Sequence, residues 1–171
     1  LALDQAADLG AGRGQRALDL ADSIPISYAI QHIGVGFDDE WSMHKVDAAF
    51  DSLDELKNFG RQRGVEVLVE NIPNALSSAK KLVEFFHVTH LNLGVCLDVG
   101  HANMMEGFDE AFDLLEDRIR SLHVHDNNGV DDKHLFPMVH NEGTENWERT
   151  MKRLRTLPES TRSNISASKA G

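Results

Sequence analysis

The sequence contains one cysteine, Cys96, among 171 residues, so no disulfide can form within the chain. A zinc site built from several thiolates is excluded for the same reason. No segment approaches the ~20 consecutive apolar residues of a membrane-spanning helix, and the N-terminus shows no basic stretch followed by an apolar core. These absences indicate a reducing, cytoplasmic setting without a membrane partner.

Basic residues are also few. Lys and Arg number 17 against 28 Asp and Glu, which gives a net charge of -11 at pH 7. Nucleic acid and anionic membranes select a broad basic surface, so this charge disfavours both partners and leaves room only for a local basic patch. The length and the 41% apolar share are typical of one globular domain with a sizeable core. The chain does not begin with methionine, and we expect an N-terminal portion to be missing.

Four short apolar runs, in contrast, each end in a side chain that can bind a metal ion. The residues that end these runs are His32, Glu70, Asp98 and His123. In a parallel α/β fold the carboxyl ends of the strands converge on one face, where active sites are built. The pattern therefore predicts both a parallel α/β fold and the place of its chemistry.

Apolar periodicity predicts strands that alternate with helices. Strands are expected at 26–33, 65–70, 93–98 and 119–125. Helices are expected at 41–63, 75–87, 107–118 and from 147 to 154, after a helix that ends over 15–21 and a further short one at 1–9. Gly64 is placed to end the helix at 41–63. Such alternation implies a parallel sheet with right-handed crossovers, and its spacing suits part of a (β/α)₈ barrel, with four to five βα units here.

The combination of His, Glu and Asp selects zinc, manganese, magnesium or cobalt. A site for one such ion needs three or four ligands and an open position for substrate. Glu70, Asp98 and His123 end three successive strands, so we expect them side by side, and His101 on the loop after Asp98 reaches the same cavity. A structural alternative remains for Asp98, which is also placed to cap the turn that follows it.

Further candidates as metal or substrate ligands are less distinctive. His32 is equally well explained as a hydrogen-bonded structural residue. His125 shares one face with His123, so we expect one of the two to face the site and the other to orient it. Asp132 and His134 lie on one side of an extended segment, although a solvated loop explains them too.

Four motifs built on these residues closely resemble the xylose-isomerase-like TIM-barrel superfamily. They read Leu-Val-Glu-Asn at 68–71, Cys-Leu-Asp-Val-Gly-His at 96–101, His-Val-His-Asp-Asn at 123–127 and Asp-Lys-His-Leu-Phe-Pro at 132–137. The resemblance runs from about residue 23 to residue 157 and makes residues 1–157 a partial barrel domain. The superfamily contains sugar-phosphate isomerases and epimerases as well as DNA repair enzymes of the endonuclease IV type.

The resemblance implies a divalent metal held by Glu70, Asp98 and His123 and completed by a Glu from a later strand. In the isomerase and epimerase members, that Glu and the one matching Glu70 move a proton next to a carbonyl through a metal-stabilised enediolate. His101 would bind a substrate oxygen. The expected substrate is a small sugar or sugar phosphate.

A second enzyme class remains open. In the endonuclease members a zinc cluster uses seven positions, and this chain has a matching residue at each of them: His32, Glu70, Asp98, His101, His123, Asp132 and His134. The ligand set therefore does not eliminate DNA repair. The family's Gly-Glu-Gly after the Asp-x-His loop is altered to Met-Val-His-Asn-Glu-Gly at 138–143.

The ends of the chain depart from the family pattern. The first two barrel strands are missing, and a Ser-rich segment stands where the strand with the last metal Glu belongs. We expect residues 158–171 to be a disordered tail produced by truncation or by a shifted reading frame. An open half barrel exposes sheet edges, so the chain is expected to need a partner or a second copy, or to be an inactive fragment.

Overall fold

The computed structural model describes residues 2–5, 11–34, 41–139 and 142–167. Within these residues six strands form one parallel sheet in which every strand pairs with its neighbour in sequence. The strands are β1 (Ala2–Gln5), β2 (Tyr28–Gln31), β3 (Glu66–Glu70), β4 (Gly94–Asp98), β5 (Ile119–Val124) and β6 (Ile165–Ala167). Sequential parallel order is the strand order of a (β/α)₈ barrel, so the predicted fold class is confirmed as part of such a barrel.

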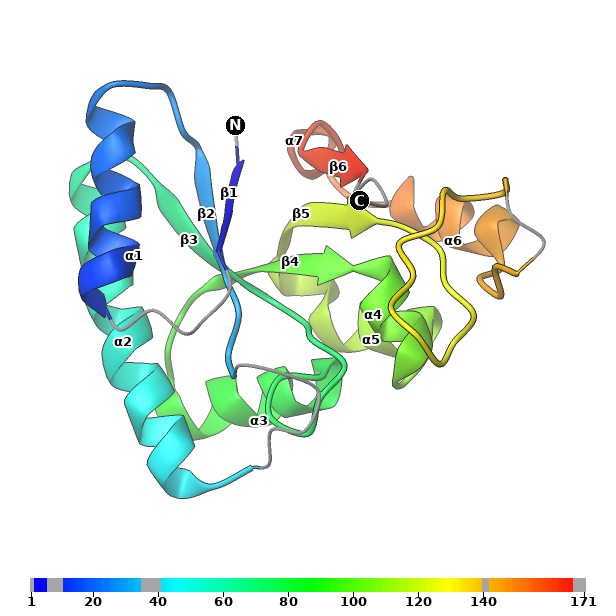
Figure 1. Ribbon diagram of the computed structural model, residues 1–171, viewed down its shortest axis with the longest axis horizontal. Coiled ribbons are helices and arrows are strands. Elements are labelled where there is room, and N and C mark those ends of the chain that lie inside the picture. The colour runs from blue at the N-terminus through cyan, green and yellow to red at the C-terminus, as the bar shows by residue number, and fades with distance from the viewer. Residues whose placement is uncertain (1, 6–10, 35–40, 140–141, 168–171) are drawn as a thin grey trace.

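Helices connect the strands and lie along the outside of the curved sheet (Figure 1). The α-helices are α1 (Ala11–Leu18), α2 (Met43–Gln62), α3 (Ala79–Thr89), α4 (Val99–Met104), α5 (Phe108–Leu115), α6 (Trp147–Leu154) and α7 (Glu159–Arg162). Two 3₁₀ helices, Asp19–Asp22 and Glu116–Arg118, follow α1 and α5. Gly64 directly follows the last residues of α2 with φ of +70°, which confirms its expected role in ending that helix.

The observed elements differ from the expected ones in ways that have local causes. Helix α3 begins at Ala79 rather than near residue 75, because the Asn74 side chain accepts hydrogen bonds from the backbone N–H groups of Leu76 and Ser77 and holds a turn there. Helix α4 was not expected. It begins directly after β4 because the Asp98 carboxylate accepts the His101 N–H at 2.8 Å and so caps its first turn.

Two expectations at the chain ends were wrong. Part of the segment expected as a short helix at 1–9 forms β1 instead, which pairs with β2. The described part of the expected disordered tail forms α7 and β6, and β6 pairs with β5. Local composition is a weak guide to a short edge strand, because a neighbouring strand supplies hydrogen bonds that no local pattern records.

The sheet separates two layers of side chains. Its outer face meets the helices in a large apolar core, where Val69 and Leu97 pack in one cluster with Phe85 of α3 and Phe112 of α5. The inner face carries a small second cluster of Ile30, Leu68 and Cys96, with Tyr28 packed against it. Since side chains alternate along a strand, the residues two positions beyond Leu68 and Cys96 also face inward. Those residues are Glu70 and Asp98.

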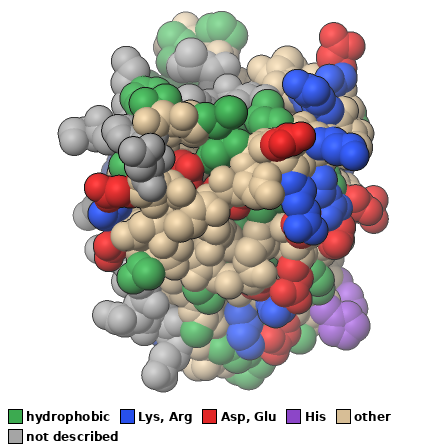
Figure 2. All heavy atoms as spheres, turned by 90° about the vertical axis from the view of Figure 1, so that its right-hand side faces the viewer, with side chains coloured by type: hydrophobic (Ala, Val, Ile, Leu, Met, Phe, Trp, Pro, Cys, Tyr) green, Lys and Arg blue, Asp and Glu red, His purple; other side chains and the backbone are tan. Residues whose placement is uncertain are grey.

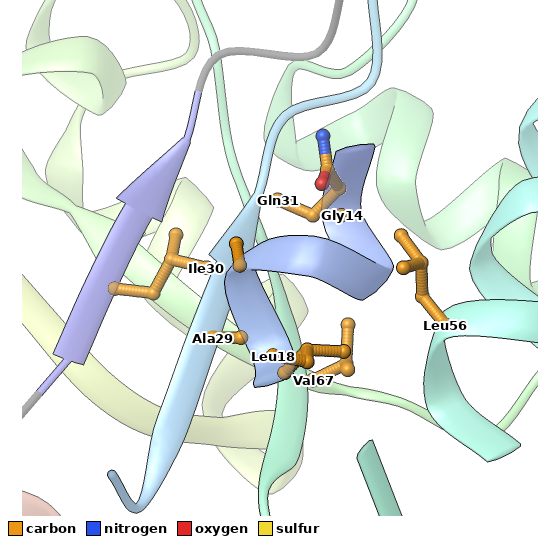
Figure 3. Close-up of a pocket in the computed structure, with 8 residues that line it drawn as sticks. Gly14, Leu18, Ala29, Ile30, Gln31, Leu56 and Val67 are labelled. Carbon is orange, nitrogen blue, oxygen red and sulfur yellow. The ribbon is translucent and has the colours of Figure 1, made fainter. Parts of the chain in front are cut away.

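The pocket in Figure 3 lies between α1, β2 and α2 and is lined mainly by small and aliphatic side chains. A Cβ at Gly14 would lie 2.6 Å from Leu56 Cδ2, so a larger residue there would require the Leu56 side chain to shift. The pocket is therefore a packing gap between helices and sheet. Its lining is mainly apolar, whereas the strand ends carry polar side chains. None of the helices in the described residues is long and apolar enough to cross a bilayer.

The buried aromatic ring of Phe112 provides a test of the outer core. We expect Phe112→Ala to lower the free energy of unfolding by ~3–5 kcal/mol, because the ring is fully buried and leaves a cavity. Leu114→Ala on the same helix is the matched control, since Leu114 is 37% exposed and its loss should cost less than ~1 kcal/mol. Urea unfolding followed by circular dichroism measures both; equal losses would contradict the assignment of the core.

Candidate metal centre

Three predicted ligands meet at the carboxyl ends of β3, β4 and β5. We call Glu70, Asp98 and His123 the strand group; their ligand atoms all lie within 4.8 Å of one another, and all three side chains are buried. His123 Nδ1 lies 3.1 Å from Glu70 Oε1 and 3.7 Å from Asp98 Oδ2. The structure thus brings together the three residues that the sequence placed side by side.

Strand register produces this meeting. Asp98 is opposite His123 in the β4–β5 pair, and Glu70 is opposite Cys96 in the β3–β4 pair. Each of the three polar residues lies at or next to the last position of its strand, where the inner face opens. The convergence therefore depends on parallel pairing, as expected for this class of fold.

A buried amide locks two of these strand ends together. Asn71 donates from its side chain to the Asp98 carbonyl oxygen at 3.0 Å, and its side-chain oxygen accepts the Asp98 N–H at 2.8 Å. The Asn71 carbonyl oxygen lies 2.9 Å from His101 Nδ1. Asn71 is therefore a supporting residue of the site. It directly follows Glu70 in the sequence, but the sequence pattern predicted no role for it, because that pattern was based on the residues that end the strands.

Four further residues form a second group, which we call the loop group: His101, His125, Asp132 and His134. Their ligand atoms also lie within 4.8 Å of one another. His134 Nε2 lies 3.0 Å from Asp132 Oδ2, and the His125 and His134 rings stack with centroids 4.0 Å apart. His101 comes from α4 rather than from the loop on which it was expected.

The two groups share a wall. His101 Nδ1 lies 3.3 Å from Glu70 Oε1, while its Nε2 lies 3.4 Å from Asp132 Oδ2. Asp98 likewise stands between His123 of the strand group and His125 of the loop group, whose Nε2 is 2.9 Å from Asp98 Oδ1. His123 therefore belongs to the strand group and His125 to the loop group, and the expectation that one of them faces the site while the other orients it stays a prediction.

His32 extends the site to β2. Its Nε2 lies 2.9 Å from Glu70 Oε2, on the opposite carboxylate oxygen from the one that contacts His123. All the predicted site residues therefore lie in one contiguous cluster. The histidines expected on the surface, His44, His87 and His90, are exposed as predicted, and His140, for which the sequence left the role open, lies outside the described residues.

The buried carboxylates and imidazoles set one another's charge. Burial alone raises the pKa of the Glu70 carboxyl, but hydrogen bonds from His101, His123 and His32 hold that pKa well below its ordinary value. Burial likewise opposes charge on the His101 ring, yet Asp98, Asp132 and Glu70 raise its pKa to about 11. Without a metal, the cluster therefore holds an ionised Glu70 next to a protonated His101.

Two buried atoms of the loop group have no hydrogen-bond partner: His125 Nε2 and Asp132 Oδ1. His125 Nε2 lies 2.9 Å from Asp98 Oδ1 and 3.6 Å from Asp132 Oδ1, but neither contact has the geometry of a hydrogen bond. A Cβ on Gly100 would lie 2.1 Å from His125 Cε1, so glycine is required for that ring to occupy its place. Unpaired buried ligand atoms and a nitrogen-oxygen donor set fit a divalent cation.

The fold and the cluster define a TIM-barrel-type α/β protein with a candidate metal centre at the carboxyl ends of its strands. The profile of one family, the xylose isomerase-like TIM barrel, matches residues 4–159. The chain belongs to that family.

Among curated proteins, uncharacterized protein MJ1311 of Methanocaldococcus jannaschii is 30% identical over 120 residues, which are 66% of this chain and 40% of that protein. The chain thus spans less than half the length of this relative. Among solved structures, a D-tagatose 3-epimerase-like protein superposes with a TM-score of 0.74 at 25% identity, over 98% of this chain and 70% of that one. The IOLI protein with a bound zinc atom superposes with a TM-score of 0.71 at 14% identity, over 91% and 63% of the two chains.

The electrostatic coupling between α4 and the strand ends is testable in the metal-free protein. We expect Asp98→Asn to lower the pKa of His101 from about 11, because Asp98 is the strongest of the charges that favour the protonated ring. The stability that His101 contributes is complete below its unfolded-state pKa, 6.5, and is lost as the pH rises toward about 11. Imidazole NMR titration measures the shift, with Asp109→Asn on α5 as the control; an unchanged His101 titration would contradict the coupling.

Proposed function

We propose that this chain carries the metal centre of a sugar isomerase or epimerase that moves a proton next to a carbonyl group. The strand group carries the proposal: two carboxylates and one imidazole, buried and mutually within reach, at the functional end of a barrel. The substrate class is a small sugar or sugar phosphate. The similarity to a D-tagatose 3-epimerase-like protein supports this class.

The donor set suits zinc, manganese, magnesium or cobalt. Glu70, Asp98 and His123 would hold the ion. His32 and His101 each contact the Glu70 carboxylate and would therefore lie next to the ion. When bound, such an ion polarises a hydroxy-carbonyl unit and stabilises the charge of an enediolate. The bound zinc of the IOLI protein structure supports a metal at the centre of this fold, without fixing its identity here.

Glu70 and His101 are the residues of the chain that handle protons and substrate oxygens in this proposal. Glu70 is ionised because three histidines surround it, so it can accept a proton from carbon at neutral pH. His101 presents a protonated ring between the two groups and can donate to a substrate oxygen through Nε2, the nitrogen that faces Asp132. Burial of both side chains keeps water from competing for these contacts.

A closing carboxylate is not supplied by the strand next to β5. Strand β6 consists of Ile165, Ser166 and Ala167, and Ser166 is the register partner of His123. The residue in register with His123 is therefore a serine and not the Glu that the family resemblance implies. The single carboxylate base at Glu70 makes slow or one-directional proton transfer the expected behaviour of this chain alone, and inactivity of the isolated chain is the rival outcome.

A zinc-dependent endonuclease is the second candidate, and the loop group favours it. His101, Asp132 and His134 are positions that the resemblance assigns to a zinc cluster, and the structure gathers them with His125 around unpaired ligand atoms. The surface argues the other way. Basic side chains lie among acidic ones on the face shown in Figure 2, and Arg153 of α6 pairs with Asp109 and Asp113 instead of forming a stripe for phosphates.

Metal content tests the proposed centre. We expect the protein to bind at least one zinc or manganese ion per chain, and Glu70→Gln to lower that stoichiometry by about one because it removes a ligand of the strand group. Elemental analysis after dialysis measures it, with Glu66→Gln at the other end of β3 as the control. Unchanged metal content in Glu70→Gln would refute the site.

Solvent exchange tests the reaction. In deuterium oxide, a proton transfer next to a carbonyl places deuterium on the substrate carbon, and we expect NMR to detect this for keto-sugars with the metal-loaded protein but not with Glu70→Gln. Cleavage of an oligonucleotide that contains an abasic site, without deuterium exchange into any sugar of the panel, would favour the endonuclease instead.

The register of β6 gives a gain-of-function test. We expect Ser166→Glu to tighten metal binding by more than about tenfold, ~1.4 kcal/mol, because it adds a carboxylate at the position in backbone register with His123. Ser163→Glu, on an exposed residue before β6, is the matched control. Competition with a fluorescent zinc chelator measures both affinities, and equal affinity in the two variants would show that the side chain at 166 does not reach the site.

A further inference from the structure

The Asp126 carboxylate ties together three points of the chain beyond β5. One oxygen accepts the Asn127 N–H at 2.8 Å and the Glu145 N–H at 3.3 Å, and the other accepts the Trp147 indole N–H at 2.6 Å. Both Asp126 and Trp147 are buried. A buried carboxylate is costly unless donors surround it, and here all the donors come from the segment that leaves β5 or returns to α6.

The backbone of the same residue closes the loop that carries two ligands. Asp126 and Leu135 exchange a pair of backbone hydrogen bonds, each 2.7 Å long. Asp132 and His134 lie within that closed loop, and His134 directly precedes Leu135. The backbone pairing of Asp126 with Leu135 therefore restrains the positions of both ligands.

The absence of a side chain at Gly143 allows the backbone to pass close to the Asp126 carboxylate. A Cβ on Gly143 would lie 2.1 Å from Asp126 Oδ2, the oxygen that accepts the Trp147 indole. The returning backbone thus passes against the carboxylate on its way to α6. Figure 1 shows this loop beside α4 and α6, at the same end of the sheet as the strand termini.

We propose that Trp147 and Asp126 are positioning residues for the loop group, acting through the indole–carboxylate hydrogen bond to hold Asp132 and His134 against His101 and His125. The zinc-binding part of the inference rests on the second candidate under the proposed function, because that candidate places a metal at the loop group. The strand group does not depend on this contact, because its three residues lie on β3 and β4 and at β5. The two groups should therefore respond differently when the contact is lost.

Trp147→Phe removes the N–H donor and keeps an aromatic ring in the buried site. We expect it to weaken zinc binding at the loop group by about 10-fold or more, as loss of a supporting hydrogen bond does in metal sites, and to leave strand-group affinity within twofold. Trp41→Phe is the matched control, since Trp41 is the other tryptophan of the chain and packs under Lys81. His134→Ala identifies which of the measured affinities belongs to the loop group.

A metal-free measurement separates this inference from the proposed function. In Trp147→Phe we expect the ring signals of His125 and His134 to shift in NMR spectra and the amides of Asp126 and Leu135 to exchange faster, while the His32 and His123 signals stay in place. If the wild-type loop group binds no zinc, the proposal of a second metal fails and these signals alone decide the positioning role.

Two results would overturn the inference: unchanged His125 and His134 signals in Trp147→Phe, or a loss of zinc affinity that is equal at both groups. Should Trp147→Phe fail to fold by circular dichroism, Asp126→Asn asks the same question, because it replaces one acceptor oxygen by a donor and keeps the size of the side chain. Broadening of all histidine signals alike in Asp126→Asn would mean that the contact supports the fold as a whole, and would also refute the inference.

Discussion

The burial of the Glu70 carboxylate is the constraint on which the site depends. A carboxylate that is 2% exposed cannot keep its charge without partners, and the structure supplies three imidazoles from different elements: the end of β2, helix α4 and the end of β5. Each of those imidazoles must in turn be held in position by other contacts. Asn71 fixes the strand ends, Asp98 starts α4 and so carries His101 inward, and the two groups of ligands come to share one wall.

This arrangement explains why the secondary structure after β4 and β5 is unusual. Asp98 serves at once as a strand end, a helix cap and a candidate ligand, so α4 must begin with no connecting loop. Gly100 is required inside that short helix because the His125 ring occupies the space of a side chain. Beyond β5 the chain folds back on Asp126 before it enters α6. The packing of charged groups at the strand ends therefore determines the local backbone conformation in these segments.

The family relationship and the geometry are two separate lines of support for the proposed chemistry. The family assignment places the chain among xylose isomerase-like barrels, and the geometry shows candidate ligands in two adjoining groups rather than one. Serine stands at the register position of His123, and the loop group holds two buried atoms without a hydrogen-bond partner. The geometry therefore offers two sets of candidate ligands. Its acidic net charge and its ion-paired α6 favour a small-molecule substrate over a polyanion.

The sequence by itself determined the strand–helix alternation, the parallel sheet and the residues of the candidate site, because apolar period and strand-end position are local properties of the chain. Glu70, Asp98 and His123 were predictable as neighbours from the parallel order alone. Helix α4, the strands β1 and β6, the division of ligands into two groups and the role of Asp126 were decided only by the tertiary structure. Each of these depends on hydrogen bonds or contacts between segments distant in sequence, such as Asn71 with Asp98 or Trp147 with Asp126, and no local pattern encodes which partner a buried polar group will find.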